Sequence, residues 1–265
     1  MPEPSNPYAA PGSRVDDIAD ASATRHLIAA GRAVPAGHGW DWLVSGWDLF
    51  KRSPGPWILI GLIFLGIVML SSSLPFIGLV ATPVLGTILL GGVMRGCAEL
   101  DRGRPIEVAH LFAGFRDKTS SLVAVALLYI VGSMVIVAIV GLMFGFSLVP
   151  VLMGQSAPPD PGAALQIFLV AVLVMLALSI PLWMAIWFAC PLIMLHDLKP
   201  LDAAKASFQG CLKNILPFLI YGVVAFVATV VASVPLLLGW LVLWPVIIAS
   251  VYTAYRDVFT EPGTA

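Results

Sequence analysis

Charged residues are scarce in this sequence. Only 11% of its 265 residues are Asp, Glu, Lys or Arg, whereas soluble globular domains carry about 25%. The mean hydropathy of +0.97 also excludes a chain that is disordered over most of its length, because disorder requires low hydrophobicity. The 14 basic and 15 acidic residues nearly cancel, so the chain lacks the basic field of a nucleic-acid binder. These absences predict a protein that crosses a membrane several times.

Cysteine is also rare, and the first residues lack a long apolar stretch. Cys97, Cys190 and Cys211 form no CxxC pair, so neither a disulfide nor a zinc site is expected. Residues 1–36 are rich in Pro, Ala, Ser and Asp and contain no apolar core of a signal peptide. We predict a disordered cytoplasmic tail over residues 1–36, a membrane domain over 37–259, and a second disordered tail over 260–265.

Uncharged runs predict six membrane-spanning helices. A bilayer core about 30 Å thick is crossed by about 20 apolar residues in a helix. Runs without a charged residue extend over 53–94, 119–159, 161–195 and 214–255. The first and the last are about twice the crossing length, and each has a proline near its middle, so each is interpreted as a helical hairpin. The predicted helices are centred at residues 57–74, 76–96, 121–147, 164–195, 215–234 and 237–255.

Prolines and basic residues add detail to this topology. Pro181 and Pro191 are expected to kink the fourth helix, because proline removes a backbone hydrogen bond. All 14 Lys and Arg residues fall before the first helix, between the second and third, between the fourth and fifth, or after the sixth. Because Lys and Arg accumulate in cytoplasmic loops, both termini are predicted to be cytoplasmic.

The segments between the hairpins repeat. Arg104-Pro-Ile-Glu-Val-Ala matches Lys199-Pro-Leu-Asp-Ala-Ala, 95 residues later. In the same way Trp47, Arg52 and Pro56 correspond to Phe208, Lys213 and Pro217. The chain is therefore predicted to be an all-α integral membrane protein of three repeat units, at about 37–97, 104–196 and 199–256. Each unit is a short cytoplasmic segment followed by a two-helix hairpin.

The short segments carry apolar residues at helical spacing. Trp40, Leu43, Val44 and Trp47 form such a stripe, with Asp41, Ser45 and Asp48 on the other face. Amphipathic helices of this kind lie in the headgroup plane, where tryptophan is favoured. We expect Trp40, Trp47, Phe112 and Phe208 to be interfacial anchors.

Several motifs resemble a known group of proteins. They are HLFAGFR at 110–116, CPLIMLHD at 190–197, SFQGCLKNILPFLIYG at 207–222 and YTAYRDVF at 252–259. With the spaced tryptophans of residues 40–50, they resemble an uncharacterised family of proteobacterial inner-membrane proteins. The resemblance covers residues 34–259. It implies a bacterial inner membrane and about six spans, and it brings no activity and no catalytic residues.

The predicted spans contain no ionisable residue away from their cytoplasmic ends. Intramembrane charges normally mark proton relays and ion sites, so we expect no catalytic, metal-binding or cofactor-binding residues. Glu107 and His110 have a Glu-x-x-His spacing, which is interpreted as a solvated helix face. Four residues at the ends of the spans form a candidate polar cluster: Arg95, Asp101, Asp197 and Arg256. They are expected either to converge and hold a lipid phosphate or to be separate anchors exposed to water.

Two functions are compatible with this pattern. The first is a non-enzymatic envelope scaffold or accessory protein of the inner membrane, which presents a basic face to lipids or to an unknown protein partner. The alternative is a permease or lipid-handling transporter for an uncharged or amphipathic substrate. A sealed, close-packed bundle would favour the scaffold, and a deep polar cavity would favour the transporter.

Overall fold

The computed structural model describes residues 26–153, 160–234 and 238–261. Eleven helices occur in this part of the chain: α1 (His38–Arg52), α2 (Pro54–Ser72), α3 (Ile77–Asp101), α4 (Val108–Leu111), α5 (Ala113–Asp117), α6 (Thr119–Leu152), α7 (Pro161–Trp187), α8 (Ala189–His196), α9 (Pro200–Lys213), α10 (Ile215–Ser233) and α11 (Trp240–Phe259). Six candidate membrane spans lie among them, in α2, α3, α6, α7 with α8, α10 and α11. The prediction of an all-helical protein with six such helices is confirmed.

Proline sets two of the helix boundaries. The turn between α2 and α3 contains Pro75, near the middle of the run that was predicted to form a hairpin, and Phe76 adopts a positive φ of 59° there. Helix α7 continues through Pro181 and ends at Trp187, four residues before Pro191. Pro191 has no N–H for the Trp187 carbonyl, so the helix breaks at Phe188. The Ser207 hydroxyl accepts a hydrogen bond from the Phe188 N–H (2.9 Å). The predicted turn at Pro235 lies outside the described residues.

Most buried residues lie at one end of the bundle, which we call the base. It consists of α1, α4, α5, α8 and α9 with the last turns of α3 and α11. The ends of α3 and α11 contact each other there, and α8 packs against α3. Fully buried side chains such as Met94, Ile193 and Phe259 fill the space between them. Towards the opposite end the helices separate and expose apolar side chains such as Leu70 and Val234.

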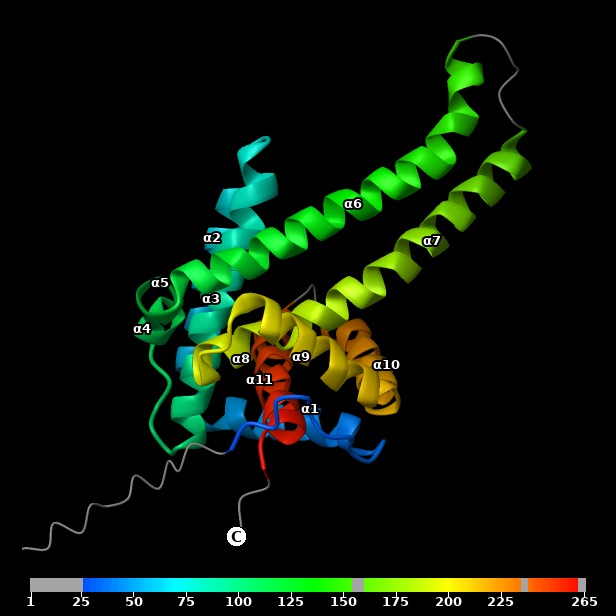
Figure 1. The fold of residues 1–265 in the computed structure, drawn as a ribbon. Coiled ribbons are helices and arrows are strands. Elements are labelled where there is room, and N and C mark those ends of the chain that lie inside the picture. Colours follow the sequence, from blue (N-terminus) through cyan, green and yellow to red (C-terminus); the bar gives the residue numbers. More distant parts are fainter. Residues whose placement is uncertain (1–25, 154–159, 235–237, 262–265) are drawn as a thin grey trace, which may run out of the picture.

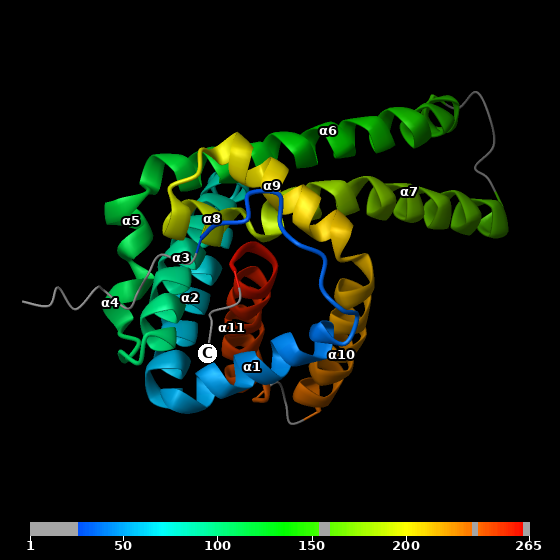
Figure 2. The same cartoon turned by 60° about the horizontal axis from the view of Figure 1, so that its bottom comes forward.

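Each short helical segment at the base packs on a long helix that precedes it in a cyclic order. Helices α4 and α5 pack on α3, α9 packs on α7, and α1 packs on α11, the last helix of the chain. Figure 2 shows α1 lying across α11 and α10. The first short segment therefore closes onto the last long helix.

Glycine allows two of these crossings to be very close. A Cβ added at Gly92 of α3 would lie 2.3 Å from the Leu111 carbonyl oxygen of α4. One added at Gly46 of α1 would lie 2.7 Å from the Val246 carbonyl oxygen of α11. Small residues let membrane helices approach in this way. The base is thus held by direct contact between backbones.

The α6–α7 hairpin runs away from the other helices (Figures 1 and 2). The two helices contact each other, for example where Leu182 lies over Gly132. No residue of α7 is buried. Only the ends of this hairpin nearest the base take part in the core.

The N-terminal segment differs from the prediction of a disordered tail through residue 36. Residues 26–36 are ordered at the base, where the Ile28 N–H donates to the Phe259 carbonyl and the Arg32 N–H to the Val258 carbonyl, both at 2.8 Å. Gly31 turns the chain with a φ of +63° against Gly210 and Val258. Composition could not reveal this, because the bonding partners lie more than 200 residues away. Residues 1–25 and 262–265 lie outside the described residues.

The glycine contacts yield a paired test. Gly92→Ala places a methyl group against the α4 backbone, and overpacking of this kind costs roughly 1–3 kcal/mol. Gly86 lies on the same helix with open space around its Cα, so Gly86→Ala is the control. We expect Gly92→Ala to lower the midpoint of thermal unfolding in detergent. We expect Gly86→Ala not to lower it. Equal midpoints would contradict the close α3–α4 crossing.

Candidate functional site

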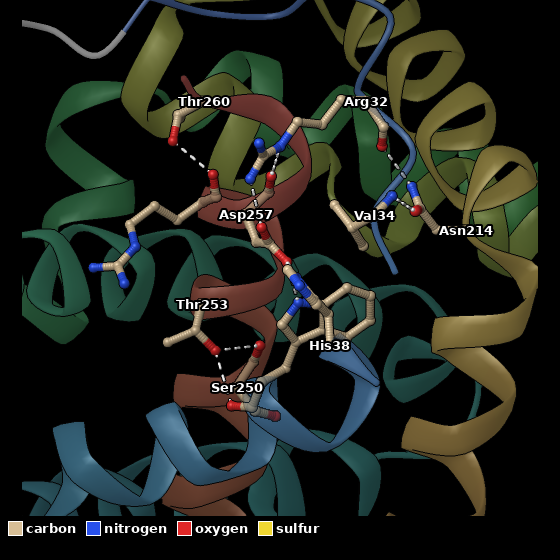
Figure 3. A network of polar contacts seen from close by, with 10 residues as sticks. Arg32, Val34, His38, Asn214, Ser250, Thr253, Asp257 and Thr260 are labelled. Atoms are coloured by element: carbon tan, nitrogen blue, oxygen red, sulfur yellow. Dashed lines mark hydrogen bonds and ion pairs between the residues drawn. The ribbon is translucent and has the colours of Figure 1, made fainter. Parts of the chain in front are cut away.

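A polar network centred on Asp257 joins three segments at the base (Figure 3). The Asp257 carboxylate, near the end of α11, accepts hydrogen bonds from Arg32 Nη2 (2.7 Å) and Trp42 Nε1 (2.8 Å). It also contacts His38 Nδ1 at 2.7 Å. Since His38 and Trp42 are four residues apart on α1, one helical face presents both rings to the same carboxylate. One acidic side chain thus connects α11, α1 and the N-terminal segment.

Asn214, between α9 and α10, fastens the same N-terminal segment from the other side. Its Oδ1 accepts a hydrogen bond from the Val34 N–H, and its Nδ2 donates to the Arg32 carbonyl, each at 2.8 Å. Lys213 Nζ donates to the carbonyls of Ala30 (3.0 Å) and Gly31 (2.9 Å). The segment is therefore held by side chains from two directions.

The hydroxyl groups near this network bond to backbone carbonyls. Thr253 Oγ1 donates to the Trp42 carbonyl (2.9 Å) across the α1–α11 contact. Ser250 Oγ lies 2.7 Å from the Ile247 carbonyl and 2.9 Å from the Tyr221 hydroxyl. Such hydroxyls satisfy buried polar groups where helices cross. Their geometry is that of helix-to-helix contacts.

A cleft of about 350 Å³ opens beside the network, between α1 and the end of α11. Arg32, His38 and Asp257 line one part of it, and Asp41 and Arg256 line another. Both signs of charge are present, so the cleft does not form a simple anion site. Of the four residues of the predicted cluster, Arg256 lines this cleft.

The structure brings two of those four residues together. Arg256 forms an ion pair with Asp101, which joins α11 to α3, and the Tyr252 hydroxyl donates to the same carboxylate (3.3 Å). Arg95 instead lies 3.8 Å from Glu99 on its own helix. Asp197 forms an ion pair with Lys118, and its side chain is 72% exposed. A phosphate site shared by all four stays a prediction.

Glu99 forms ion pairs with arginines at and after the end of α3. Its carboxylate accepts a hydrogen bond from Arg102 Nη1 (3.1 Å) and another from Arg104. Beyond this turn, Glu107 is the N-cap of α4 and its N–H donates to His110 Nδ1 (2.9 Å), which completes a capping box. The Glu-x-x-His pair therefore starts a helix.

The four predicted anchors are not all equally exposed. Trp40, Trp47 and Phe112 are between 39% and 55% exposed, and Phe208 is half-buried. Leu43, placed on the same predicted stripe, is buried in the core instead. Helix α1 therefore has two apolar faces, one against the protein and one turned outward. Whether the outward rings lie among lipid headgroups stays a prediction.

Burial affects the chemistry of the cysteines. All three are buried and free. Outside the spans, burial raises the pKa of the Cys211 thiol to about 12, and its Sγ lies 3.6 Å from the Met184 carbonyl. Because a thiol with this pKa stays protonated at neutral pH, Cys211 lacks the thiolate that metal binding or nucleophilic attack requires.

Comparison with known proteins agrees with the membrane-spanning helices. The chain is 28% identical over 255 residues to a probable inner membrane protein of Burkholderia thailandensis, over 87% of this chain and 94% of that protein. This chain, with its six membrane-length helices, is a multi-pass membrane protein. The similarity agrees with the resemblance to uncharacterised proteobacterial inner-membrane proteins. No family model matches the chain, and no solved structure matches it.

Sequence reasoning missed the centre of the site. Asp257 directly follows Arg256 at the end of a span, but the predicted polar cluster includes Arg256 and not Asp257. Arg32 was assigned to the disordered tail. The i, i+4 spacing of His38 and Trp42 was the available signal, because it places two hydrogen-bonding rings on one face of α1. It does not reveal which acidic residue they meet.

The network predicts an unequal cost for two acidic residues. Asp257→Ala removes the acceptor shared by three side chains, and hydrogen bonds to charged groups contribute roughly 1.5–3 kcal/mol each. Asp48 forms an exposed ion pair with Lys51 (2.7 Å), and exposed pairs contribute about 0–1 kcal/mol. We expect Asp257→Ala to lower the thermal midpoint in detergent and Asp48→Ala to leave it nearly unchanged. The network would not be needed for stability if the two variants behaved alike.

Proposed function

We propose that this chain is a non-enzymatic scaffold or accessory protein of the bacterial inner membrane, whose base faces the cytoplasm. The observation that carries the proposal is the uneven burial of the spans. The base is close-packed, whereas no residue of α7 is buried, so the part of the α6–α7 hairpin beyond the base is open to lipid or to another membrane protein. A chain that acted alone through an internal path would be expected to enclose its hairpins around that path.

The cytoplasmic orientation of the base is supported by its charge. The described Lys and Arg residues all belong to the base or to the segments that join it, and short cytoplasmic loops carry such residues in excess. Arg116, Lys199 and Lys205 make no ion pair with any described residue. These three cations are available to anionic headgroups or to an acidic partner.

The cyclic packing at the base supports a threefold repeat. Each proposed unit is a short helical segment followed by a hairpin: α1 with α2 and α3, α4 and α5 with α6 and α7, and α9 with α10 and α11. Each short segment contacts the second long helix of the preceding unit, and α1 contacts that of the last. A chain of three related units would make three such contacts if it closed into a ring.

The short segments are proposed to lie at the membrane interface. On α1, the residues Trp40, Val44 and Trp47 are all exposed and share one helical face. On α5 and its N-cap, Phe112 and Phe115 are exposed as well. Apolar rings on the outer face of a helix that is bound to protein on its inner face suit the headgroup boundary.

The absence of enzymatic activity is part of the proposal. It is supported by how the polar groups at the base are used: Asp257, Glu99 and Asp101 each bind arginine, and Thr253 donates to a backbone carbonyl. A nucleophile needs an adjacent base that is free to take its proton. The described contacts instead join one helix to another.

The alternative function, a permease or lipid-handling transporter, is favoured by a different observation. Two apolar grooves of about 500 Å³ and 540 Å³ lie along the spans. Neither is the deep polar cavity that a transporter of polar solutes would need. For this alternative, the apolar grooves favour a substrate with a hydrocarbon chain.

The orientation can be tested by thiol labelling. In a background with the native cysteines replaced by serine or alanine, Asp160→Cys lies before α7 and Asp202→Cys lies on α9 at the base. We expect a membrane-impermeant maleimide to label the first in cells with a permeabilised outer membrane and the second only after lysis. The reverse pattern would place the base outside the cytoplasm.

The scaffold proposal can be tested on the hairpin itself. A photo-crosslinking amino acid at Phe168, which is 62% exposed on α7, should give a protein adduct of discrete mass in living cells. The same probe at Trp57, which is fully buried, should give none. Discrete adducts at neither position, together with lipid transfer between leaflets in proteoliposomes, would favour the lipid-handling alternative.

A further inference from the structure

Two grooves on this protein have the same construction although they lie between different helices. The first runs between α2 and α11 and is lined by Ile58, Phe64, Leu65 and Trp244. The second runs between α7, α10 and the end of α9, and is lined by Ile180, Trp183, Trp187 and Phe218. In the cyclic order described above, both lie where the first long helix of one unit meets the second long helix of the unit before it.

An aromatic pair bridges the two walls in each groove. The rings of Phe64 on α2 and Trp244 on α11 have centroids 4.9 Å apart. Those of Phe218 on α10 and Trp187 on α7 are 5.9 Å apart and perpendicular. At the third junction of this kind, α6 packs directly on α3, where Leu122 lies against Gly91. The grooves thus recur at two of the three equivalent junctions, and side-chain packing occupies the third.

The groove walls contain no charged side chain, and in the second groove the buried indole N–H of Trp187 has no hydrogen-bond partner among the described residues. In the second groove, Ser179 donates to the Met175 carbonyl (2.7 Å), and the Cys211 thiol lies against the Met184 carbonyl. The remaining lining side chains are apolar except for the indole N–H groups of Trp183 and Trp187. A ligand for this groove is therefore expected to be hydrocarbon over most of its contact with the wall.

The size of the groove distinguishes between hydrocarbon occupants. A helix is about 10–12 Å across, so even ten residues of a partner helix fill roughly 1,200 Å³. The second groove holds about 540 Å³, so a helix of this length would lie mostly outside it. A single acyl chain is narrower than a helix and has no backbone groups to satisfy.

The position of the second groove selects a source for that chain. Its lower end reaches Cys211, Leu212 and Ile215, where α9 ends and α10 begins, and it continues up α7 to Leu176. The predicted anchor Phe208 and the cation Lys205, both on α9, lie on the base side. A lipid whose headgroup lies at the level of α9 would extend its tail along this groove.

We infer that the α7–α10 groove is a binding site for one acyl chain of a phospholipid from the leaflet on the base side, and that the α2–α11 groove is a related site. In a bilayer the acyl chain is already surrounded by hydrocarbon, so its binding is not driven by the hydrophobic effect. Binding is stabilised by packing contacts with the aromatic walls of the groove. The site is distinguished from ordinary surrounding lipid by retention of its lipid in detergent. The inference rests on the membrane location alone and is compatible with a structural lipid in a scaffold or a substrate in a lipid-handling protein.

Photo-crosslinking on purified protein tests this site. Ile180 lines the groove and is 59% exposed, and Val227 on α10 is 54% exposed but does not line it. Each is replaced by the same photo-crosslinking amino acid in otherwise wild-type protein. The protein is extracted from membranes, washed with detergent and irradiated. We expect an adduct with the mass of one phospholipid at position 180 and none at position 227.

A groove-filling variant provides a second measurement. Ile180→Trp adds side-chain volume inside the groove, and Val227→Trp adds the same indole to the exposed face of α10. Native mass spectrometry in detergent, after delipidation and addition of a defined phosphatidylethanolamine, should show loss of one bound lipid for Ile180→Trp and no loss for Val227→Trp. As a control, the thermal midpoint of each variant is measured in detergent. Both midpoints should equal that of the wild type, because both substitutions lie on exposed surfaces.

Three results would overturn the inference: a protein adduct at position 180, equal lipid adducts at positions 180 and 227, or unchanged lipid stoichiometry in Ile180→Trp. A protein adduct would show that a partner segment occupies the groove. None of these outcomes affects the scaffold proposal, which depends on adducts from Phe168 in living cells.

Discussion

The structure depends on one property of the bilayer: hydrocarbon offers no hydrogen-bond partner to a charged side chain. The chain meets this constraint by placing nearly all of its charges at the base and satisfying them there. The Asp257 carboxylate accepts hydrogen bonds from α1 and from the N-terminal segment, and Asp101 forms an ion pair with Arg256 of α11. The polar contacts that join distant parts of the chain are therefore concentrated in one layer at the end of the bundle.

Packing at the base follows from the same concentration. Helices that carry charged residues at their ends are drawn into pairs, and glycines such as Gly46 and Gly92 allow the paired backbones to touch. Away from the base, such contacts join the two helices of one hairpin, as between the Ser71 and Thr82 hydroxyls (3.0 Å) and where Gly239 lies against Ala232. The α6–α7 hairpin separates from the other helices, because apolar side chains gain little from leaving lipid for another helix. A rigid base with diverging hairpins is the expected balance of these effects.

This uneven packing supports the functional proposals. An uncovered α6–α7 hairpin suits contact with lipid or a membrane partner, and the junctions between diverging helices leave grooves that Trp187 and Trp244 line. The polar groups at the base hold helices together. In the proposed scaffold role, the protein would organise neighbours in the membrane.

The sequence alone determined the class of the protein and its six spans, because the length and polarity of a run report directly on whether that run can enter hydrocarbon. It also located the charged ends of the helices, and it suggested a threefold repeat that stays a prediction. The sequence did not reveal that Arg32 belongs to the base or that Asp257 is its centre. It placed Arg95 and Arg256 in one candidate cluster, whereas in the structure Arg95 lies near Glu99 and Arg256 forms an ion pair with Asp101. The two results differ because hydropathy is a property of each residue against its solvent, while an ion pair depends on the distance between residues far apart in the chain, which only the packing of the helices sets.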